Sequence, residues 1–87
     1  MSGKHHYLKI SPRYFMAVDS GLKPFEVRVN DRDFKRFDIL HLQEWCGEEY
    51  SGNETVQEVT YILDDPNYCK EGYVIMALKP YVEGESK

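Results

Sequence analysis

The sequence predicts an α+β fold that is mostly β, with about five strands and one short helix arranged as a small barrel. Apolar residues alternate with polar ones in several stretches, which is the period of a strand. One other stretch has helical spacing between a helix start and a glycine. The resulting order of one strand, one helix and four further strands suits a mostly antiparallel barrel that the helix plugs or flanks.

The first predicted strand covers residues 6–10, "HYLKI". Its alternation points Leu8 and Ile10 inward, while Tyr7 and Lys9 face the other side. The strand is short because a helix start follows it directly.

The predicted helix has clear start and stop signals. Ser11 is a suitable N-cap, Pro12 fits the first helical position, and Gly21 is a natural C-terminal stop. The apolar residues that recur at helical spacing are Phe15, Val18 and Leu22. One short amphipathic helix therefore fits this segment.

From residue 25 the period changes to two, which predicts a second strand. One face carries Phe25, Val27 and Val29. The other face carries Glu26, Arg28 and Asn30. The charged segment that follows is predicted to be a turn.

Three more strands are predicted in the second half of the chain, at residues 38–45, 54–63 and 73–78. The glycine-containing segment 47–53 is predicted to be a hairpin loop. Val59, Tyr61 and Leu63 are predicted to share one face of the middle strand. Residues 73–78 are apolar throughout, which predicts a central strand covered on both faces.

The chain of 87 residues is expected to form one domain over residues 1–79, with a flexible tail at 80–87. A second core would leave each half too little apolar surface to offset its conformational entropy. The content of 41% apolar and 14% aromatic residues favours a packed core over disorder.

The charge is distributed unevenly along the chain. A formal net charge of −4 argues against charge-driven binding to nucleic acid. Residues 1–37, however, hold eight Lys/Arg and four Asp/Glu, whereas residues 38–87 hold three and eleven. Either the folded molecule carries a basic patch, or the two halves attract each other and leave a mixed surface.

The cysteines and histidines do not have the spacing of metal ligands, so no metal, no cofactor and no disulfide are expected. No apolar run has the length of a membrane span, and none resembles a signal peptide. The sequence therefore predicts a cytoplasmic protein with no membrane partner.

Lys23, Glu26 and Arg28 stand close together where the helix exit meets the second strand. Two interpretations are open. The charges cover a solvated sheet face, where they contribute little to stability. Alternatively they form a site in which Arg28 and Lys23 bind a phosphate and Glu26 reads a base amine.

Gly21, Lys23, Glu26 and Arg28 match the G-x-K-x-x-E-x-R signature of the ASCH domains, a barrel superfamily related to the PUA RNA-binding fold. Stretches such as "VTYILDD" at 59–65 resemble the small bacterial and phage family DUF3850. The resemblance covers most of the chain. It implies a PUA-like barrel that binds RNA or a nucleotide-like ligand in a cleft lined by the signature residues.

A set of nine residues is expected to bind that ligand: Gly21, Lys23, Glu26, Arg28, Asn30, Asp31, Arg32, Tyr7 and Lys9. The segment 30–32 is included because it extends the signature strand into a loop, where recognition residues tend to lie. Its alternative role is a turn capped by its own side chains.

Two other functions are open. Some ASCH relatives are reported as amidohydrolases of acetylated cytidine that use a lysine, a threonine and a glutamate. Lys23 falls on that lysine, but Glu26 occupies the threonine position, so a hydrolase would need Glu26 as general base and Lys23 at an oxyanion. The acidic second half would also fit a protein-interaction domain of a phage or mobile element.

Two residues depart from the resemblance. Pro24 stands where threonine is frequent, and it removes a backbone N–H from the loop expected to line the cleft. Phe37 stands where a glycine commonly precedes the next strand, so the turn there is expected to be reshaped.

Overall fold

The computed structural model describes residues 3–82 of the chain. They form β1 (His5–Ile10), α1 (Pro12–Asp19), β2 (Phe25–Val29), β3 (Ile39–Trp45), β4 (Tyr50–Leu63) and β5 (Tyr73–Pro80). This succession confirms the predicted element order and the mostly β class. Within the described residues, no helix is long and apolar enough to cross a membrane.

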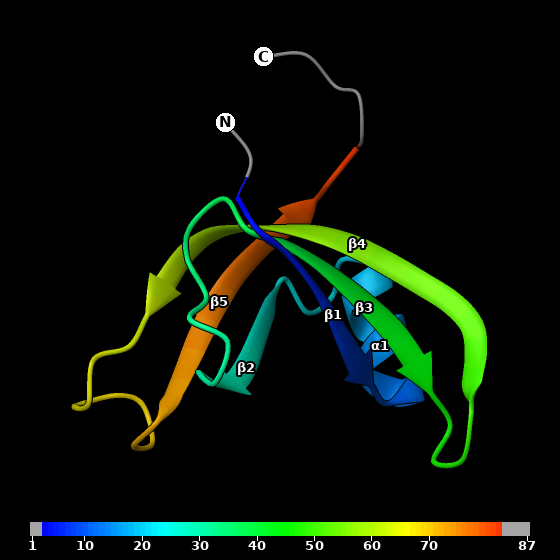
Figure 1. Ribbon diagram of the computed structural model, residues 1–87, viewed down its shortest axis with the longest axis horizontal. Helices are drawn as coiled ribbons and strands as arrows, with labels where there is room; N and C mark the ends of the chain where they lie inside the picture. Colours follow the sequence, from blue (N-terminus) through cyan, green and yellow to red (C-terminus); the bar gives the residue numbers. More distant parts are fainter. Residues whose placement is uncertain (1–2, 83–87) are drawn as a thin grey trace.

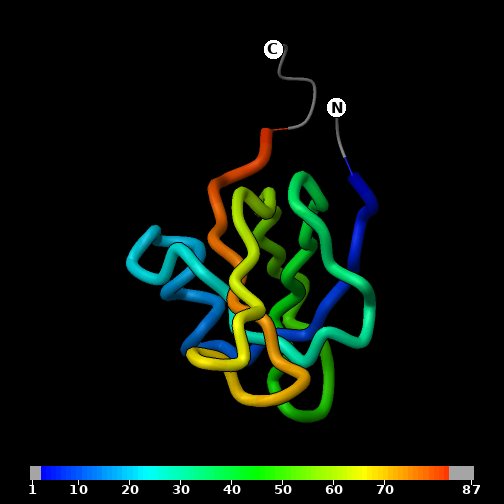
Figure 2. The backbone as a smooth tube through the Cα atoms, turned by 90° about the vertical axis from the view of Figure 1, so that its left-hand side faces the viewer, coloured from blue at the N-terminus to red at the C-terminus, as the bar shows by residue number. Residues whose placement is uncertain are grey.

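The strands form one sheet in the order β1-β3-β4-β5-β2. β1 pairs with β3 in parallel, and the other three pairs are antiparallel. The sheet curls into an open half-barrel (Figures 1 and 2). Among residues 3–82 no backbone ladder joins β1 to β2, so these are the two edge strands. The place where β1 and β2 face each other is called the seam below.

The core lies between the curled sheet and α1, which sits under the arch of β3 and β4 (Figure 1). Leu8 and Ile10 of β1 are buried, as predicted, and α1 contributes Phe15 and Val18. The remaining buried members of this core are Phe34, Leu40, Leu42, Val59, Val74, Met76 and Leu78. Each such side chain contributes about 1.5–3 kcal/mol on full burial, so the helix and the sheet stabilise each other.

The signals that predicted α1 are confirmed at both ends. Ser11 has the extended backbone of an N-cap, although its side chain makes no capping hydrogen bond, and Pro12 is the first helical residue. Gly21 ends the segment with φ of 87°, which an L side chain rarely adopts. The prediction that Leu22 joins the apolar face is wrong, because α1 stops at Asp19 and Leu22 is exposed.

An irregularity in β4 reverses part of the predicted alternation. Val59 is fully buried, but Tyr61 is 61% exposed, and Ile62 packs against the core instead. The pairing of β4 with β5 shifts register between Val59 and Tyr61. Such a bulge inserts one extra residue and turns the following side chains to the opposite face. The prediction that Val59 and Tyr61 share a face is therefore wrong.

The hairpin between β3 and β4 is shorter than predicted, since β4 already begins at Tyr50. Trp45 pairs with Tyr50 across the two strands, and their rings meet edge to face with centroids 4.9 Å apart. Such a pair stabilises the ladder close to the turn. Residues 50–53 therefore belong to the strand.

β5 lies between β4 and β2, as predicted for a central strand. Val74, Met76 and Leu78 are buried, and the alternate residues on the other face are partly buried. The strand continues to Pro80, which the sequence placed in a tail. Residues 83–87 of that predicted tail lie outside the described part of the chain.

Candidate functional site

The side chain of Glu26 points into the half-barrel, and the residue is only 4% exposed. Its neighbours Phe25, Val27 and Val29 occupy the outer face of β2 and are exposed. The interpretation of the charges as a solvated sheet face is therefore wrong for Glu26. A buried carboxylate is costly unless it is paired and hydrogen-bonded, so its partners decide what this strand does.

Lys23 and Arg28 hold the two oxygens of that carboxylate. Lys23 Nζ donates to Glu26 Oε1 at 2.7 Å, and Arg28 Nε donates to Glu26 Oε2 at 2.7 Å. Lys23 Nζ also donates to the carbonyl oxygen of Phe25 at 2.9 Å. Hydrogen bonds between charged groups are the strong ones, so these three side chains position each other. We call Lys23, Glu26 and Arg28 the signature cluster.

Arginine side chains bridge the seam where the sheet has no backbone ladder. Arg28 Nη2 donates to the carbonyl oxygen of Lys9 at 2.7 Å, and Arg32 Nη1 donates to that of Tyr7 at 3.3 Å. Both acceptors belong to β1, the opposite edge strand. The guanidinium groups thus satisfy edge carbonyls that a further strand would satisfy in a closed barrel.

Two neighbouring hollows open at the seam, and Val27 lines both. The first has a volume of about 520 Å³, and its walls include Ile10, Ser11, Tyr14, Lys23, Phe25 and Glu26. The second has a volume of about 320 Å³, and its walls include Leu8, Arg28, Asp31, Arg32, Phe34 and Tyr73. We call them the Glu26 hollow and the Arg28 hollow.

The other expected site residues are placed less uniformly. Tyr7 and Lys9 reach the seam only through their carbonyl oxygens, because the Tyr7 ring stacks on His41 and the Lys9 ammonium lies over Trp45. Gly21 lies at the helix exit, with positive φ and open space around its α-carbon. Its part in the signature is thus to turn the chain toward β2.

In the loop after β2, one residue caps a turn and two others line a hollow. Asn30 Oδ1 accepts a hydrogen bond from the Phe34 N–H at 3.0 Å, which is the capped turn. Asp31 and Arg32 line the Arg28 hollow, and their charged groups lie 4.0 Å apart at the surface. The capped turn is therefore confirmed for Asn30, and a recognition role for Asp31 and Arg32 stays a prediction.

Comparison with known families matches residues 5–78 to the family described as Domain of unknown function (DUF3850). The chain belongs to this family. An uncharacterized 12.9 kDa protein in the GpA 3′ region of Escherichia phage P2 is 33% identical over 76 residues, which are 87% of this chain and 69% of the phage protein. The predicted resemblance to DUF3850 is confirmed, and the matched range contains the whole signature cluster.

Pro24 and Phe37, the two residues that depart from the family resemblance, both affect the backbone. Phe37 has φ of 77°, in the left-handed region that glycine adopts without strain. Pro24 lacks an N–H, but its carbonyl oxygen accepts from the Leu78 N–H at 3.0 Å and so starts the pairing of β2 with β5. Pro24 therefore helps to fix the register that turns Glu26 inward.

A buried hydrogen bond between His6 of β1 and Asp38 was not predicted from the sequence. His6 Nε2 and Asp38 Oδ2 lie 2.8 Å apart, and Asp38 also accepts from the backbone N–H groups of Lys4 and Lys35. Burial acts to raise the pKa of Asp38, but these hydrogen bonds outweigh it and hold that pKa below its ordinary value. Asp38 thus ties β1 to the start of β3.

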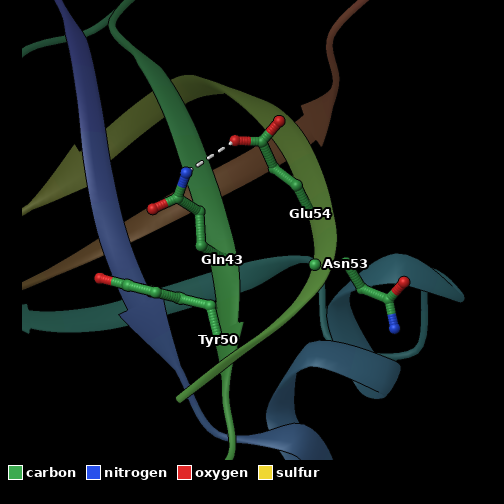
Figure 3. Close-up of a pocket in the computed structure, with 5 residues that line it drawn as sticks. Gln43, Tyr50, Asn53 and Glu54 are labelled. Atoms are coloured by element: carbon green, nitrogen blue, oxygen red, sulfur yellow. Dashed lines mark hydrogen bonds between the residues drawn. The ribbon is translucent and has the colours of Figure 1, made fainter.

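A third hollow, of about 390 Å³, lies on the β3–β4 hairpin of the DUF3850 fold. Gln43, Tyr50 and Glu54 extend to one side of the hairpin, whereas Asn53 points to the other (Figure 3). Gln43 donates to Glu54, and Asn53 donates to Glu44. These polar groups satisfy each other and do not converge on one point, so the seam is the stronger candidate.

Tyr14 is the seam residue that the sequence did not indicate. Its ring lines the Glu26 hollow, and Lys23 Nζ lies 5.3 Å from the ring centroid. It is exposed on the outer side of a short helix, so its spacing alone carried no signal. Only the folded chain, in which α1 and β2 line the same hollow, brings it to this candidate site.

Proposed function

We propose that this chain binds RNA or a nucleotide-like ligand at the seam, with the signature cluster as the recognition element. The observation that carries the proposal is the buried Glu26 carboxylate, held between Lys23 and Arg28 at the wall of a hollow of about 520 Å³. A fixed acceptor beside two cations suits a ligand that has both an amino group and a phosphate.

The chemistry of the two hollows suggests how such a ligand would divide between them. A carboxylate has about four lone-pair sites, of which Lys23 and Arg28 occupy two, so Glu26 can still accept from a base amine. Tyr14 and Phe25 offer exposed rings beside it for stacking. The base would therefore occupy the Glu26 hollow.

The phosphate would occupy the Arg28 hollow. Arg28 lends its remaining guanidinium N–H groups, and the side chain of Arg32 is 47% exposed there. Asp31 lies beside them, so only part of this positive charge is available to a phosphate. Binding would accordingly depend on these arginines individually rather than on a broad basic surface. The resemblance to ASCH and PUA-like domains supports the same assignment.

The test is the binding of short, fluorescently labelled single-stranded RNA measured by anisotropy over a series of salt concentrations. Replacing Arg32→Ala removes a phosphate partner, so affinity should fall and the salt slope should decrease by about one. Arg36→Ala is the matched control, because Arg36 donates to the Thr60 carbonyl oxygen outside both hollows. Equal affinity and slope in the two variants would remove the assignment.

Hydrolysis of an acylated nucleoside is the alternative that uses the same residues. Both oxygens of Glu26 already accept from cations, which favours a role in binding over a role as general base. Incubation with N4-acetylcytidine, followed by chromatography, separates the two. Release of cytidine that is lost in Lys23→Ala would make the chain a hydrolase. If neither RNA nor nucleoside binds, the interaction with a protein partner becomes the leading function.

A further inference from the structure

Two histidines meet on the outer face of the sheet, away from the signature cluster. His5 lies in β1 and His41 lies in β3, and their rings are held together by the parallel pairing of these strands. His5 Nδ1 and His41 Nε2 are 2.8 Å apart. The sequence did not predict this contact, because the two residues are far apart in the chain and only the register of β1 on β3 unites them.

Three residues hold the ring of His41 in one orientation: His5, Tyr7 and Glu54. Tyr7 stacks on it, with centroids 4.3 Å apart and an angle of 17° between the planes. Glu54 Oε2 lies 3.5 Å from His41 Nδ1, on the side of the ring opposite His5. Gln43 in turn donates to Glu54 Oε2 at 3.2 Å (Figure 3). The side chain of His41 is only 15% exposed, so these contacts leave it little freedom.

Glu54 stands on the Nδ1 side of His41, and a proton on Nδ1 would leave Nε2, which faces His5, with a free lone pair. Metal-binding histidines have this arrangement, in which the second ring nitrogen faces a carboxylate. Two nitrogens about 2.0–2.1 Å from one ion and at right angles to each other lie about 2.9 Å apart. The observed separation of 2.8 Å, at which the two rings can also share a hydrogen bond, is compatible with that geometry.

We propose that His5 Nδ1 and His41 Nε2 bind one first-row transition-metal ion at adjacent coordination positions, with Glu54 as the residue that orients His41. Imidazole ligands at right angles suit Cu²⁺ or Ni²⁺ better than tetrahedral Zn²⁺, and Mg²⁺ prefers oxygen ligands. Within residues 3–82 no group of three or more His, Cys, Asp or Glu side chains converges. Water or an external ligand therefore fills the remaining positions.

The experiment is a titration of the untagged, full-length protein with Ni²⁺ at neutral pH, followed by calorimetry and by NMR. Paramagnetic broadening should centre on residues 5–7 and 41. His5→Ala and His41→Ala should each weaken Ni²⁺ binding by at least tenfold, because each removes one of two protein ligands. His5 is exposed, so His5→Ala also tests the site without disturbing the core.

The orienting role of Glu54 is tested separately. Glu54→Gln should weaken Ni²⁺ binding by about tenfold, the lower end of the effect of losing such a partner. Glu58→Gln is the matched control, because Glu58 lies on the same strand and faces Lys79 instead. Ni²⁺ binding that is unchanged in both histidine variants, or that is undetectable at millimolar Ni²⁺, would overturn the proposal and leave a hydrogen-bonded imidazole pair.

Discussion

Arg28 Nη2 donates to the carbonyl oxygen of Lys9 at 2.7 Å, across the seam between the two edge strands. The same guanidinium donates from Nε to Glu26. One side chain thus links the buried carboxylate of β2 to the backbone of β1. The arginine of the signature therefore also bridges the two edge strands of the half-barrel.

Arg28→Lys should therefore lower the free energy of unfolding and weaken the bridge between β2 and β1 at the seam. A lysine ammonium is a point donor and cannot reproduce the two separate directions of the guanidinium. We expect a loss of about 1 kcal/mol in the free energy of unfolding, because one charge-assisted bond at a partly exposed site is lost. Urea denaturation measures it. Arg36→Lys, at an exposed arginine outside the seam, should change little, and equal losses would contradict the bridging role.

Glu26→Gln should be more damaging than an ordinary surface charge change. The amide cannot accept from Lys23 and Arg28 as a carboxylate does, so two cations lose their common partner. We expect a loss of about 2 kcal/mol, below the range for fully buried pairs because both cations remain partly exposed. Denaturation of Glu58→Gln, whose partner Lys79 is 3.9 Å away, provides the control. A loss no larger than in that control would show that the cluster is dispensable.

The burial of Glu26 is what the alternating pattern of β2 alone could not predict. Phe25, Val27 and Val29 are the apolar set, and period-two reasoning normally places such a set inside. The structure exposes them, because β2 is an edge strand whose inner face meets the seam and its cations. The signature residues gave the only hint, since three charges at fixed spacing suit a paired cluster as well as an open surface.

Acid should destabilise the protein through Asp38. The folded pKa of Asp38 lies below its ordinary value of 3.8, so its carboxylate contributes stability that is fully present above that value. This stability is lost as the pH falls below 3.8 through the folded pKa. Asp38→Asn should therefore reduce the loss of unfolding free energy on acidification over this range, as measured by urea denaturation at a series of pH values. Asp33→Asn, at an exposed position in the same loop, should leave this pH dependence unchanged. The same pH dependence in Asp38→Asn as in the unaltered protein would contradict the stabilising role of Asp38.

Phe37 offers a test of backbone strain. Its φ of 77° suits glycine, so Phe37→Gly should be about 1 kcal/mol more stable than Phe37→Ala. Thermal unfolding of the two variants measures the difference. The same pair of substitutions at Phe25, in the extended strand β2, should show the reverse order, because glycine weakens a strand. The same order at both positions would contradict the strain.

Local signals predicted the element order because they act within a few residues. Ser11, Pro12 and Gly21 define α1 without reference to the rest of the chain. The features that escaped prediction depend on pairing between distant segments. The bulge after Val59 reverses the face of Tyr61, and the parallel register of β1 on β3 brings His5 to His41. Neither the bulge nor the contact between the histidines can be recognised from the spacing of neighbouring residues.

The candidate site at the seam was likewise predicted only where local sequence signals act. The signature named Lys23, Glu26 and Arg28, and the structure brings them into one cluster. Tyr14 joins the candidate site only because the fold brings α1 and β2 to the walls of the same hollow. Tyr7 and Lys9 were expected among the ligand-binding residues, and their backbone oxygens reach the seam while their side chains contact His41 and Trp45.

The most direct test of a ligand site at the seam is an NMR titration of the labelled protein with a short single-stranded RNA. Amide shifts should cluster at residues 23–32 and at Tyr14. At the same RNA concentration they should be smaller in Arg32→Ala and unchanged in Arg36→Ala. Shifts that cluster on another face, or that are the same in both variants, would contradict the account.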